Sequence, residues 1–456
     1  MSNVVAKYQK YAEYKDSGVE WLGEIPSEWE MWKLSHAYLE IGSGTTPPTD
    51  NEKWFDGEIP WVTTGELRET IILDTNKKIS KKTTEQFPTL RKYPKGSIAI
   101  AMYGATIGRL GIFGVEATTN QACCVMTKSK VINNFFLFYW LQAFKGEIVQ
   151  LSSGGGQPNI NQEKVASLRV SAPNVAEQTQ IANFLDHETT KIDHLIEKQQ
   201  QLIGLLKEKR QAVISHAVTK GLNPDAPMKD SGVEWLGEVP EHWSVSALGY
   251  YSYLNTGATP DRSNSNYWEG EIPWIKTGEV RYDTIFSAEE SITDLALKQT
   301  SVQLSPPGTL LMAMYGQGIT RGRVALLGVS ATYNQACVAI NPNSKVWNEY
   351  LKLFFMAAYH AIRDGGNETS QMNLNADIVK KFKITIPSLD EQHQIVENLN
   401  KEIPKIDSLI EKAESAIQLM QERRTALISA AVTGKIDVRH HASRPTGNDN
   451  YQTEVI

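Results

Sequence analysis

Two long stretches of the chain have the hydrophobic spacing of amphipathic helices. After Pro173, and again after Pro387, helix-breaking residues become rare and apolar residues recur at gaps of three, four and seven. Such gaps are typical of a coiled-coil seam, which two segments of one chain can form by packing together as an antiparallel pair. The predicted seam residues are Ile181, Leu185, Ile192, Leu195, Leu202, Leu206 and Val213 in the first stretch, and Ile395, Leu399, Ile406, Leu409 and Leu427 in the second.

The segments that precede these helices have a different texture. Short alternating runs such as SIAIAMYG and LRVSAP are separated by Gly and Pro, and aromatic and β-branched residues are frequent. This pattern predicts a mixed α/β domain with many strands and loops.

The chain contains the same sequence twice. The run KDSGVEWLGE at 15–24 recurs at 229–238, which is 214 positions later, and ATTNQAC at 117–123 returns as ATYNQAC at 331–337 with the same offset. A period of this length is too long for a solenoid repeat, so each copy should hold its own core. We therefore predict an α+β fold in which two mixed α/β domains alternate with two long helices, related by an internal pseudo-two-fold repeat. The expected boundaries are 1–172 for the first domain, 173–222 for the first helix, 223–386 for the second domain, 387–437 for the second helix and 438–456 for a flexible tail.

An antiparallel pair of helices would place the two domains at opposite ends of one rod. Each domain is attached at the start of its own helix, and a helix of about 40 residues is about 60 Å long. Two similar but non-identical heads held at a fixed separation suit a target with two different half-sites.

Composition and charge narrow the possible functions. The 456 residues carry 46 Lys and Arg against 52 Asp and Glu, a net charge of −6, so any DNA binding must be local or shared with partners. Three cysteines cannot build a disulfide framework or a metal knuckle. No apolar run reaches the length of a membrane span, and the first residues do not have the pattern of a signal peptide. We expect a cytoplasmic protein without membrane contact.

Three motifs suggest chemistry, and each has a simpler explanation. The run Ser305-Pro306-Pro307-Gly308 begins like an amino-methyltransferase motif but has Gly where an aromatic ring is needed, so we interpret it as a turn before a strand. Asp390-Glu391-Gln392-His393 resembles a helicase box, yet the chain has no phosphate-binding GxxxxGK[ST] loop. His440 and His441 have no third metal ligand nearby in the sequence. We therefore predict neither a catalytic centre nor a metal site.

The order of the motifs resembles the specificity subunit of type I restriction-modification systems. The resemblance covers almost the whole chain, from KDSGVEWLGEIPSEW through GSGTTPP and EIPWVTTGE to the duplicated EQ-x-x-I helix starts at Glu177 and Glu391. It implies a non-catalytic subunit that reads double-stranded DNA with two target recognition domains. It also implies that the helices set the spacer of a bipartite target and dock two methyltransferase subunits, which are joined by two restriction and translocase subunits. The resemblance places S-adenosylmethionine on the methyltransferases, and ATP and Mg²⁺ for cleavage on the other partners, with no cofactor on this chain.

Candidate DNA-reading residues lie on loops where the two copies diverge while the flanking sequences agree. Arg and Lys suit guanine edges and phosphates, Asn and Gln suit adenine, and Thr can contact either. Alternatives remain: the Gly-rich loops can be plain turns, Tyr103 and Tyr315 can be core rings, and the aligned Arg109 and Arg323 can form a structural ion pair instead of holding phosphate. The candidates are Thr45, Lys53, Arg68, Tyr103, Arg109, Gln157 and Asn159 in the first domain, and Arg262, Lys276, Arg281, Tyr315, Gln317, Arg321, Arg323 and Asn373 in the second.

Two other function classes stay open at this point. An autonomous enzyme would transfer methyl groups or cut DNA unaided. A structural coiled-coil adaptor would leave the modified DNA sequence unchanged when the loops named above are exchanged.

Overall fold

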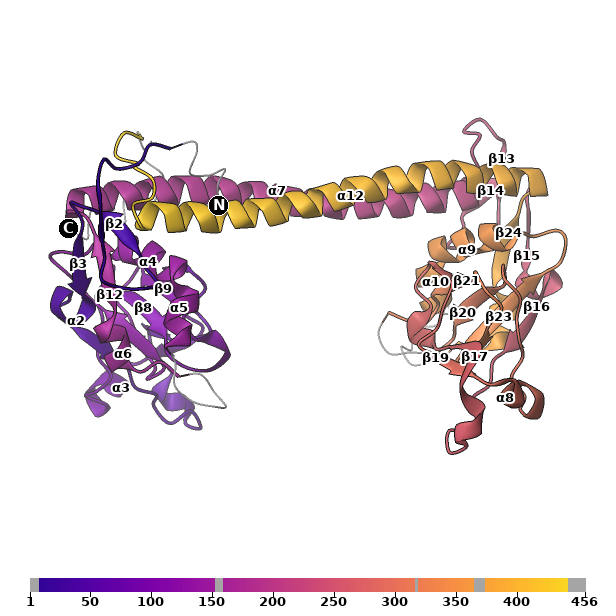
Figure 1. Cartoon of the computed structure of the whole chain (residues 1–456). Helices are drawn as coiled ribbons and strands as arrows, with labels where there is room; N and C mark the ends of the chain where they lie inside the picture. The colour runs from indigo at the N-terminus through magenta and orange to yellow at the C-terminus, as the bar shows by residue number, and fades with distance from the viewer. Residues whose placement is uncertain (1–7, 152–158, 316–318, 365–373, 442–456) are drawn as a thin grey trace. The chain divides into compact units, whose positions relative to one another are not determined.

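The computed structural model describes residues 8–151, 159–315, 319–364 and 374–441. The chain forms two compact units: the first draws on residues up to 199 and from 415 onward, and the second on residues 200–414. Each unit contains one globular head and one half of each long helix (Figure 1). The units therefore do not follow the linear order of the sequence, because both long helices pass from one unit into the other.

The head of the first unit is built around a five-stranded sheet with the order β4-β11-β8-β9-β6. Its central strand β8 alternates between two cores. Ile98 and Ile100 pack with Phe136 and Trp140 of helix α4. Ala99 and Ala101 point the other way and belong to the core on the other face of the sheet. The elements of this head are β1 (Tyr14–Asp16), β2 (Glu24–Pro26), β3 (Glu30–Lys33), α2 (Leu34–Ala37), β4 (Ile41–Ser43), η1 (Glu52–Trp54), β5 (Ile59–Val62), β6 (Thr70–Ile72), β7 (Lys78–Ile79), α3 (Lys81–Gln86), β8 (Ile98–Ala101), η2 (Gly104–Thr106), β9 (Leu110–Phe113), β10 (Thr118–Thr119), β11 (Cys123–Met126), α4 (Asn134–Ala143), α5 (Lys145–Gln150), α6 (Gln162–Ser167) and β12 (Arg169–Ala172).

Smaller sheets complete this head. A three-stranded sheet, β10-β5-β7, contributes Val62 to the core that covers Ala99, and the ribbon β12-β3 leads the chain into the first long helix. The β6 strand pairs in parallel with β9, while β8 pairs antiparallel with β9 and β11.

The head of the second unit repeats this arrangement. Its five-stranded sheet has the order β16-β23-β20-β21-β18, and its three-stranded sheet has the order β19-β17-β22. Its elements are β13 (Met228–Asp230), β14 (Glu238–Pro240), β15 (Ser244–Ala247), η3 (Leu248–Tyr250), β16 (Ser252–Thr256), η4 (Ser265–Tyr267), β17 (Trp268–Ile275), η5 (Thr277–Glu279), β18 (Thr284–Ile285), β19 (Glu290–Ile292), α8 (Asp294–Gln299), β20 (Leu310–Ala313), β21 (Val324–Leu327), β22 (Thr332–Tyr333), β23 (Cys337–Pro342), α9 (Asn348–Ala357), α10 (Tyr359–Asp364), α11 (Ala376–Lys381) and β24 (Lys383–Ile386).

The two long helices are α7 (Val175–Lys220) and α12 (Leu389–Val432). Within each unit, one half of α7 packs against one half of α12. In the first unit Arg424 Nε donates to Asp193 Oδ1 over 2.8 Å, and in the second Arg210 Nε donates to Asp407 Oδ1 over 2.7 Å. Between the two pairs, the contact moves forward along α7 from residue 193 to residue 210 and backward along α12 from residue 424 to residue 407. The helices therefore run antiparallel, as predicted. Each arginine lies 214 residues from the other and so does each aspartate, which makes the two ion pairs copies of one contact.

Three leucines placed in the predicted seam lie outside it, which corrects the prediction. Leu195, Leu202 and Leu409 are 52%, 42% and 50% exposed. Each is followed by a partly buried isoleucine, at 196, 203 and 410. The seam therefore uses the later residue of each apolar pair and alternates gaps of four and three, through 192, 196, 199, 203, 206, 210 and 213 in α7 and 399, 403, 406, 410, 413, 417, 420, 424 and 427 in α12.

Each head is fixed to the start of a long helix by a tryptophan and a glutamate. In the first unit Trp29 is fully buried and its Nε1 donates to Glu177 over 3.3 Å. In the second unit Trp243 Nε1 donates to Glu391 over 2.9 Å. These tryptophans hold the head on its helix, so the repeated openings of the two copies have a packing function.

The chain stays ordered beyond the boundary predicted for the tail. The sequence predicts loose order from 438, but Val438 is 1% exposed and belongs to the core of the first unit. Asp437 bonds Arg439, and the ring of His441 lies 5.1 Å from that of Tyr8. The residues up to His441 therefore pack in the first unit, against residues near the start of the described chain.

Candidate nucleic-acid interface

A loop scaffold in the first head brings distant segments together. Thr45 N donates to Thr119 O over 3.0 Å, and Trp61 Nε1 donates to Thr45 O over 3.2 Å. Asn120 N donates to Val62 O, and Asn120 Oδ1 accepts from the backbone N of residue 122 over 3.1 Å. These bonds fix the turn that carries Gln121, an exposed residue, beside Thr46, whose hydroxyl donates to Gln121 Oε1.

The second head builds the same loop scaffold from the corresponding residues. Ala258 N donates to Tyr333 O over 3.0 Å, and Trp274 Nε1 donates to Ala258 O over 2.9 Å. Asn334 Oδ1 accepts from the backbone N of residue 336 over 3.1 Å, which forms the same turn. Thr259 Oγ1 donates to Gln335 Oε1. We call the two side-chain pairs, Thr46 with Gln121 and Thr259 with Gln335, the Thr–Gln clasps.

Some predicted site residues have the same surroundings in both heads. Tyr103 and Tyr315 are each 37% exposed and directly follow a buried methionine, so neither is a core ring. In each head the backbone N of this methionine donates over 2.8 Å to the carbonyl of the residue that follows the clasp glutamine, Ala122 or Ala336. The structure therefore brings these tyrosines next to the clasps. Tyr103 also forms an isolated bridge with Asn159, which adds a second predicted residue to the site.

The predicted arginines form two equivalent pairs. Arg68 and Arg281 are exposed, and their Nε atoms donate to the carbonyls of Gly65 and Gly278 over 3.1 and 2.7 Å. Each guanidinium is thereby anchored at Nε on a tight turn. Arg109 and Arg323 are partly buried, and the guanidinium of Arg323 lies 5.7 Å from the ring of Tyr282.

Other predicted residues differ between the heads. In the second head Arg262 lies over the ring of Trp268 at 4.0 Å and is ion-paired with Glu290. Lys276 Nζ contacts Glu289 and Glu290 over 2.8 and 3.0 Å. The hydrogen bond from Arg262 holds the pKa of Glu290 below its usual value, and the hydrogen bond to Glu289 raises the pKa of Lys276. The cluster is therefore charged and ordered before any ligand arrives.

The first head has no such ion-paired cluster among its described residues at the equivalent positions, where Lys77 Nζ lies 4.8 Å from the ring of Phe55. Thr63 takes the place of Lys276, and its hydroxyl bonds Glu66 over 3.1 Å. Lys53 lies exposed in η1, and Thr45 Oγ1 bonds Thr89 over 2.9 Å. The heads thus share a scaffold and differ in the charged groups presented on it.

Several predicted residues are not placed beside the clasps. Gln157, Gln317 and Asn373 lie outside the described residues. Arg321 is described as partly buried and lies just after one of these gaps. Sequence reasoning also missed the residues of the Thr–Gln clasps. Their only signal was the repeated NQA run, which served as a marker of the duplication, whereas the threonines lie 75 and 76 residues away in the sequence.

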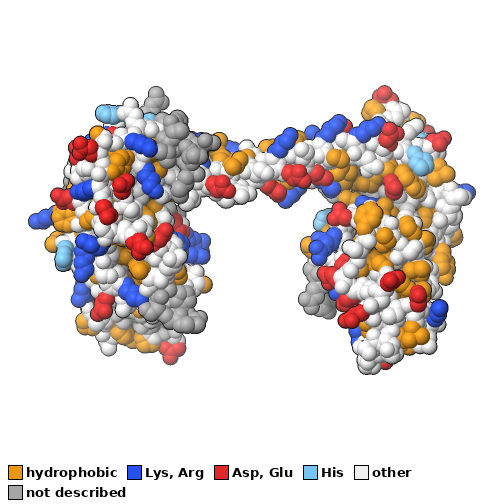
Figure 2. All heavy atoms as spheres, in the orientation of Figure 1, with side chains coloured by type: hydrophobic (Ala, Val, Ile, Leu, Met, Phe, Trp, Pro, Cys, Tyr) orange, Lys and Arg blue, Asp and Glu red, His pale blue; other side chains and the backbone are white. Residues whose placement is uncertain are grey.

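The described residues show no cluster of three or more His, Cys, Asp or Glu side chains that could hold a metal. All three cysteines are buried, and burial raises the pKa of each thiol, which disfavours the nucleophilic thiolate. No described helix is long and apolar enough to cross a membrane. On the visible face of the described residues, Lys and Arg side chains are interspersed with Asp and Glu (Figure 2), in agreement with the small net charge.

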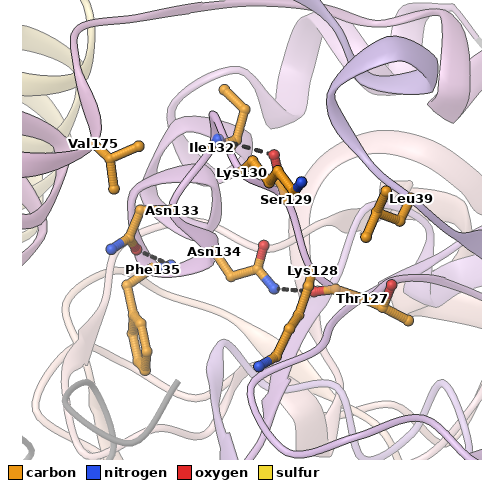
Figure 3. Close-up of a pocket in the computed structure, with 10 residues that line it drawn as sticks. All are labelled: Leu39, Thr127, Lys128, Ser129, Lys130, Ile132, Asn133, Asn134, Phe135 and Val175. Atoms are coloured by element: carbon orange, nitrogen blue, oxygen red, sulfur yellow. Dashed lines mark hydrogen bonds between the residues drawn. The ribbon is translucent and has the colours of Figure 1, made fainter. Parts of the chain in front are cut away.

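A pocket of about 420 Å³ lies elsewhere in the first unit, near the start of α7. Figure 3 shows that Leu39, Phe135 and Val175 line it and that Asn134 bonds the backbone of Thr127. Asn134 Nδ2 reaches that carbonyl and the carbonyl of Gly96, each over 2.7 Å, so its donors stabilise the fold. The pocket is also lined by polar residues, Thr127, Lys128, Ser129 and Lys130.

These features define a duplicated protein whose two heads present the same loop surface with different charged side chains. The model of the type I restriction modification DNA specificity domain matches residues 26–203 and 240–418. The chain belongs to this family, as its motif order suggested, and is a type I restriction-modification specificity subunit with two DNA specificity domains.

Known relatives match either nearly the whole chain or a large part of it. The type I restriction enzyme MjaIX specificity subunit of Methanocaldococcus jannaschii is 23% identical over 449 residues, which cover 95% of this chain and 99% of the relative. The EcoR124I/EcoR124II specificity subunit of Escherichia coli is 24% identical over 63% of this chain and 68% of its own length.

Solved structures show the same fold. A chain from a study of assembly and conformational transition in the type I R-M system has a TM-score of 0.74 at 13% identity, over 90% of this chain and 99% of its own. The HsdS subunit from Thermoanaerobacter tengcongensis has a TM-score of 0.56 at 14% identity and covers 90% of this chain and 98% of its own. The predicted fold class, two mixed α/β domains alternating with two long helices, is confirmed.

Proposed function

We propose that this chain reads a bipartite DNA target without catalysing any reaction. Each head binds one half-site, and the antiparallel helices fix the unspecified spacer between the half-sites. The observation that carries this proposal is the combination of an identical loop scaffold with different exposed charges. The scaffold positions each head on the duplex in the same way, while the differing side chains select different bases.

The charged cluster of the second head supports base reading. Arg262 is stacked on Trp268 and ion-paired with Glu290, so its guanidinium is ordered before binding. An ordered guanidinium loses less conformational entropy when it bonds guanine O6 and N7. The first head lacks this cluster among its described residues, so it would read different bases.

The helices support partner docking. Exposed leucines lie on both of them: Leu195 and Leu419 in the first unit, and Leu202, Leu205 and Leu409 in the second. Each directly precedes a seam residue, so all lie about 100° around the helix from the seam. We call them the leucine flank. Leu195 corresponds to Leu409, and Leu205 to Leu419, 214 residues apart. Two equivalent apolar sites favour two equivalent partners, which we identify as two methyltransferase subunits.

Cofactors and further partners are assigned to the complex and not to this chain. The methyltransferases would carry S-adenosylmethionine, and two restriction and translocase subunits would use ATP and Mg²⁺ for cleavage. With a net charge of −6, this chain should bind DNA weakly alone and tightly once the methyltransferases contribute phosphate contacts.

Exchange of one head tests the proposal. Residues 223–386 are replaced by the corresponding domain of another specificity subunit, and methylated adenines are mapped across the host genome. One half of the methylated sequence should change while the other half and the spacer stay the same. A methylated sequence that does not change, or that changes in both halves, contradicts the proposal.

The isolated chain provides the second test. Mixed with S-adenosylmethionine and DNA, it should transfer no methyl group, and its binding to target DNA in a gel shift should strengthen sharply when the methyltransferase is added. Methyl transfer, or tight sequence-specific binding, by the chain alone would contradict the assignment.

A further inference from the structure

The Thr–Gln clasps orient two exposed amide groups in the same way. Thr46 Oγ1 donates to Gln121 Oε1, and Thr259 Oγ1 donates to Gln335 Oε1. Each amide oxygen therefore accepts one hydrogen bond that orients the side chain, and the Nε2 group, a double donor, has no hydrogen-bond partner among the described residues. A ligand that bonds this Nε2 group must supply hydrogen-bond acceptors.

The backbone beneath each clasp is held rigidly. A Cβ on Gly44 would lie 1.8 Å from Thr119 O, and one on Gly257 would lie 2.1 Å from Tyr333 O, so the threonine-bearing loops lie directly against the strands that lead into the glutamine turns. A buried tryptophan, Trp61 or Trp274, bonds the same loop from behind. The glutamine therefore presents its donors at a fixed place in each head.

The two clasps consist of the same residue types with the same hydrogen bond, which indicates that they contact the same feature of DNA in both half-sites. The charged groups nearby differ, since Lys276 stands where the first head has Thr63. A side chain that selects a base should differ in the same way if the half-sites differ. The feature that two different half-sites share is the sugar–phosphate backbone, whose phosphate oxygens are acceptors.

We propose that Gln121 and Gln335 each donate to a DNA phosphate and fix the position of their head on the duplex. They act as positioning residues that do not select bases, and the assignment rests on the proposed function. The neighbouring Tyr103 and Tyr315 place both clasps on the surface that carries the predicted site residues. A neutral amide adds this contact without adding net charge.

Substitution in the full complex with methyltransferase tests the proposal. Gln121→Ala, Gln335→Ala and the double variant are compared by fluorescence anisotropy on the cognate duplex and on a duplex with scrambled half-sites. Each single variant should lose about five- to tenfold in affinity for both duplexes, and the two losses should multiply in the double variant. The ratio of cognate to scrambled affinity should stay that of the unaltered complex. Gln121→Glu, which turns the donor into an anion, should lose more, especially at low salt.

Controls separate this outcome from loss of folding and from failure of the proposed function. Gln86→Ala removes an exposed glutamine from α3 of the same head and should bind as the unaltered complex does. Thermal unfolding midpoints should be unchanged for all variants. A reduced cognate-to-scrambled ratio, or a methylated sequence altered at a base, would assign the glutamines to base reading and overturn the proposal. Unchanged affinity for both duplexes would also overturn it. An unaltered complex that does not discriminate between the duplexes would refute the proposed function itself.

Discussion

At the scale of single residues, the second head has a guanidinium that is held from two sides. Trp268 supports the face of Arg262, and Glu290 pairs with one of its nitrogens. The pKa of Glu290 is lowered in the folded chain, so the pair is present above the ordinary value of 4.5 and is lost only as the pH falls through the lowered pKa. Near neutral pH the arrangement is therefore constant.

Replacement of Arg262 should relax recognition in one half-site. If Arg262 bonds guanine, Arg262→Ala should cost about 1–3 kcal/mol of discrimination at one base pair, and Arg262→Lys should recover only part of it because Lys cannot form the bidentate contact. Binding of the methyltransferase complex to duplexes with single base changes measures this. Lys53→Ala in the first head is the control. Any loss of discrimination that it causes should fall in the half-site bound by the first head and not in the half-site bound by the second. An equal loss on every duplex would show that Arg262 holds phosphate.

The two glycines beneath the clasps should tolerate no side chain. Gly44→Ala and Gly257→Ala each force a Cβ onto a backbone carbonyl, which we expect to cost about 1–3 kcal/mol of stability through displaced loops. Thermal unfolding should show a lowered midpoint for each variant. Gly278→Ala is the matched control, because a Cβ there meets nothing within 4 Å and the residue has no positive φ. If Gly44→Ala and Gly278→Ala unfold at the same temperature, the tight packing of the loop is wrong.

The sequence predicts loops for the candidate site but not the hydrogen bonds that join them. Tyr103, Arg68 and their counterparts could be named because their residue types suit DNA contact and they lie on or beside loops that differ between the copies. Gln121 and Gln335 were missed because the bond that orients each glutamine comes from a threonine 75 or 76 residues away. Only the fold brings those segments together.

At the scale of elements, the helices show where hydrophobic periodicity is ambiguous. The apolar pairs Leu195-Ile196, Leu202-Ile203 and Leu409-Ile410 each offer two candidates for one seam position. Spacing alone therefore predicted the helices and their pairing but not which residue of each pair is buried. The structure buries the isoleucines more deeply and leaves the leucines exposed.

The leucine flank should determine how many methyltransferases bind. Leu195→Ser with Leu419→Ser removes the duplicated leucine pair of the first unit, and Leu205→Ser with Leu409→Ser removes the corresponding pair of the second. Each double variant should form complexes with one methyltransferase, and the fourfold variant should bind neither, because burial of each leucine contributes about 1.5–3 kcal/mol. Native mass spectrometry counts the subunits. Ile196→Ser with Met420→Ser, at seam positions, should instead lower the unfolding temperature. Complexes that retain two methyltransferases in every leucine variant would show that the partners dock elsewhere.

At the scale of the whole molecule, duplication has produced one pair of helices that both heads share. α7 and α12 each contribute to both units, and the residues of α7 near the boundary at 199 and 200 belong to neither loop scaffold. The proposed function thus separates the bases that are read from the distance between them. Under that proposal, residues in the heads select the bases and the length of α7 sets the spacer.

An insertion in α7 tests this separation. Four residues added after Gln200 lengthen the helix by about 6 Å and rotate its C-terminal half by about 40° beyond a full turn. One base pair advances the duplex by about 3.4 Å and about 34°, so the spacer in the methylated sequence should lengthen by about one to two base pairs. Mapping of methylated adenines in cells that carry the variant gives both the spacer and the half-sites. The bases of both half-sites should be those of the unaltered chain, because no head residue has changed. A spacer of the original length would show that the helices do not set it, whereas altered half-site bases would show that reading and spacing are not separate.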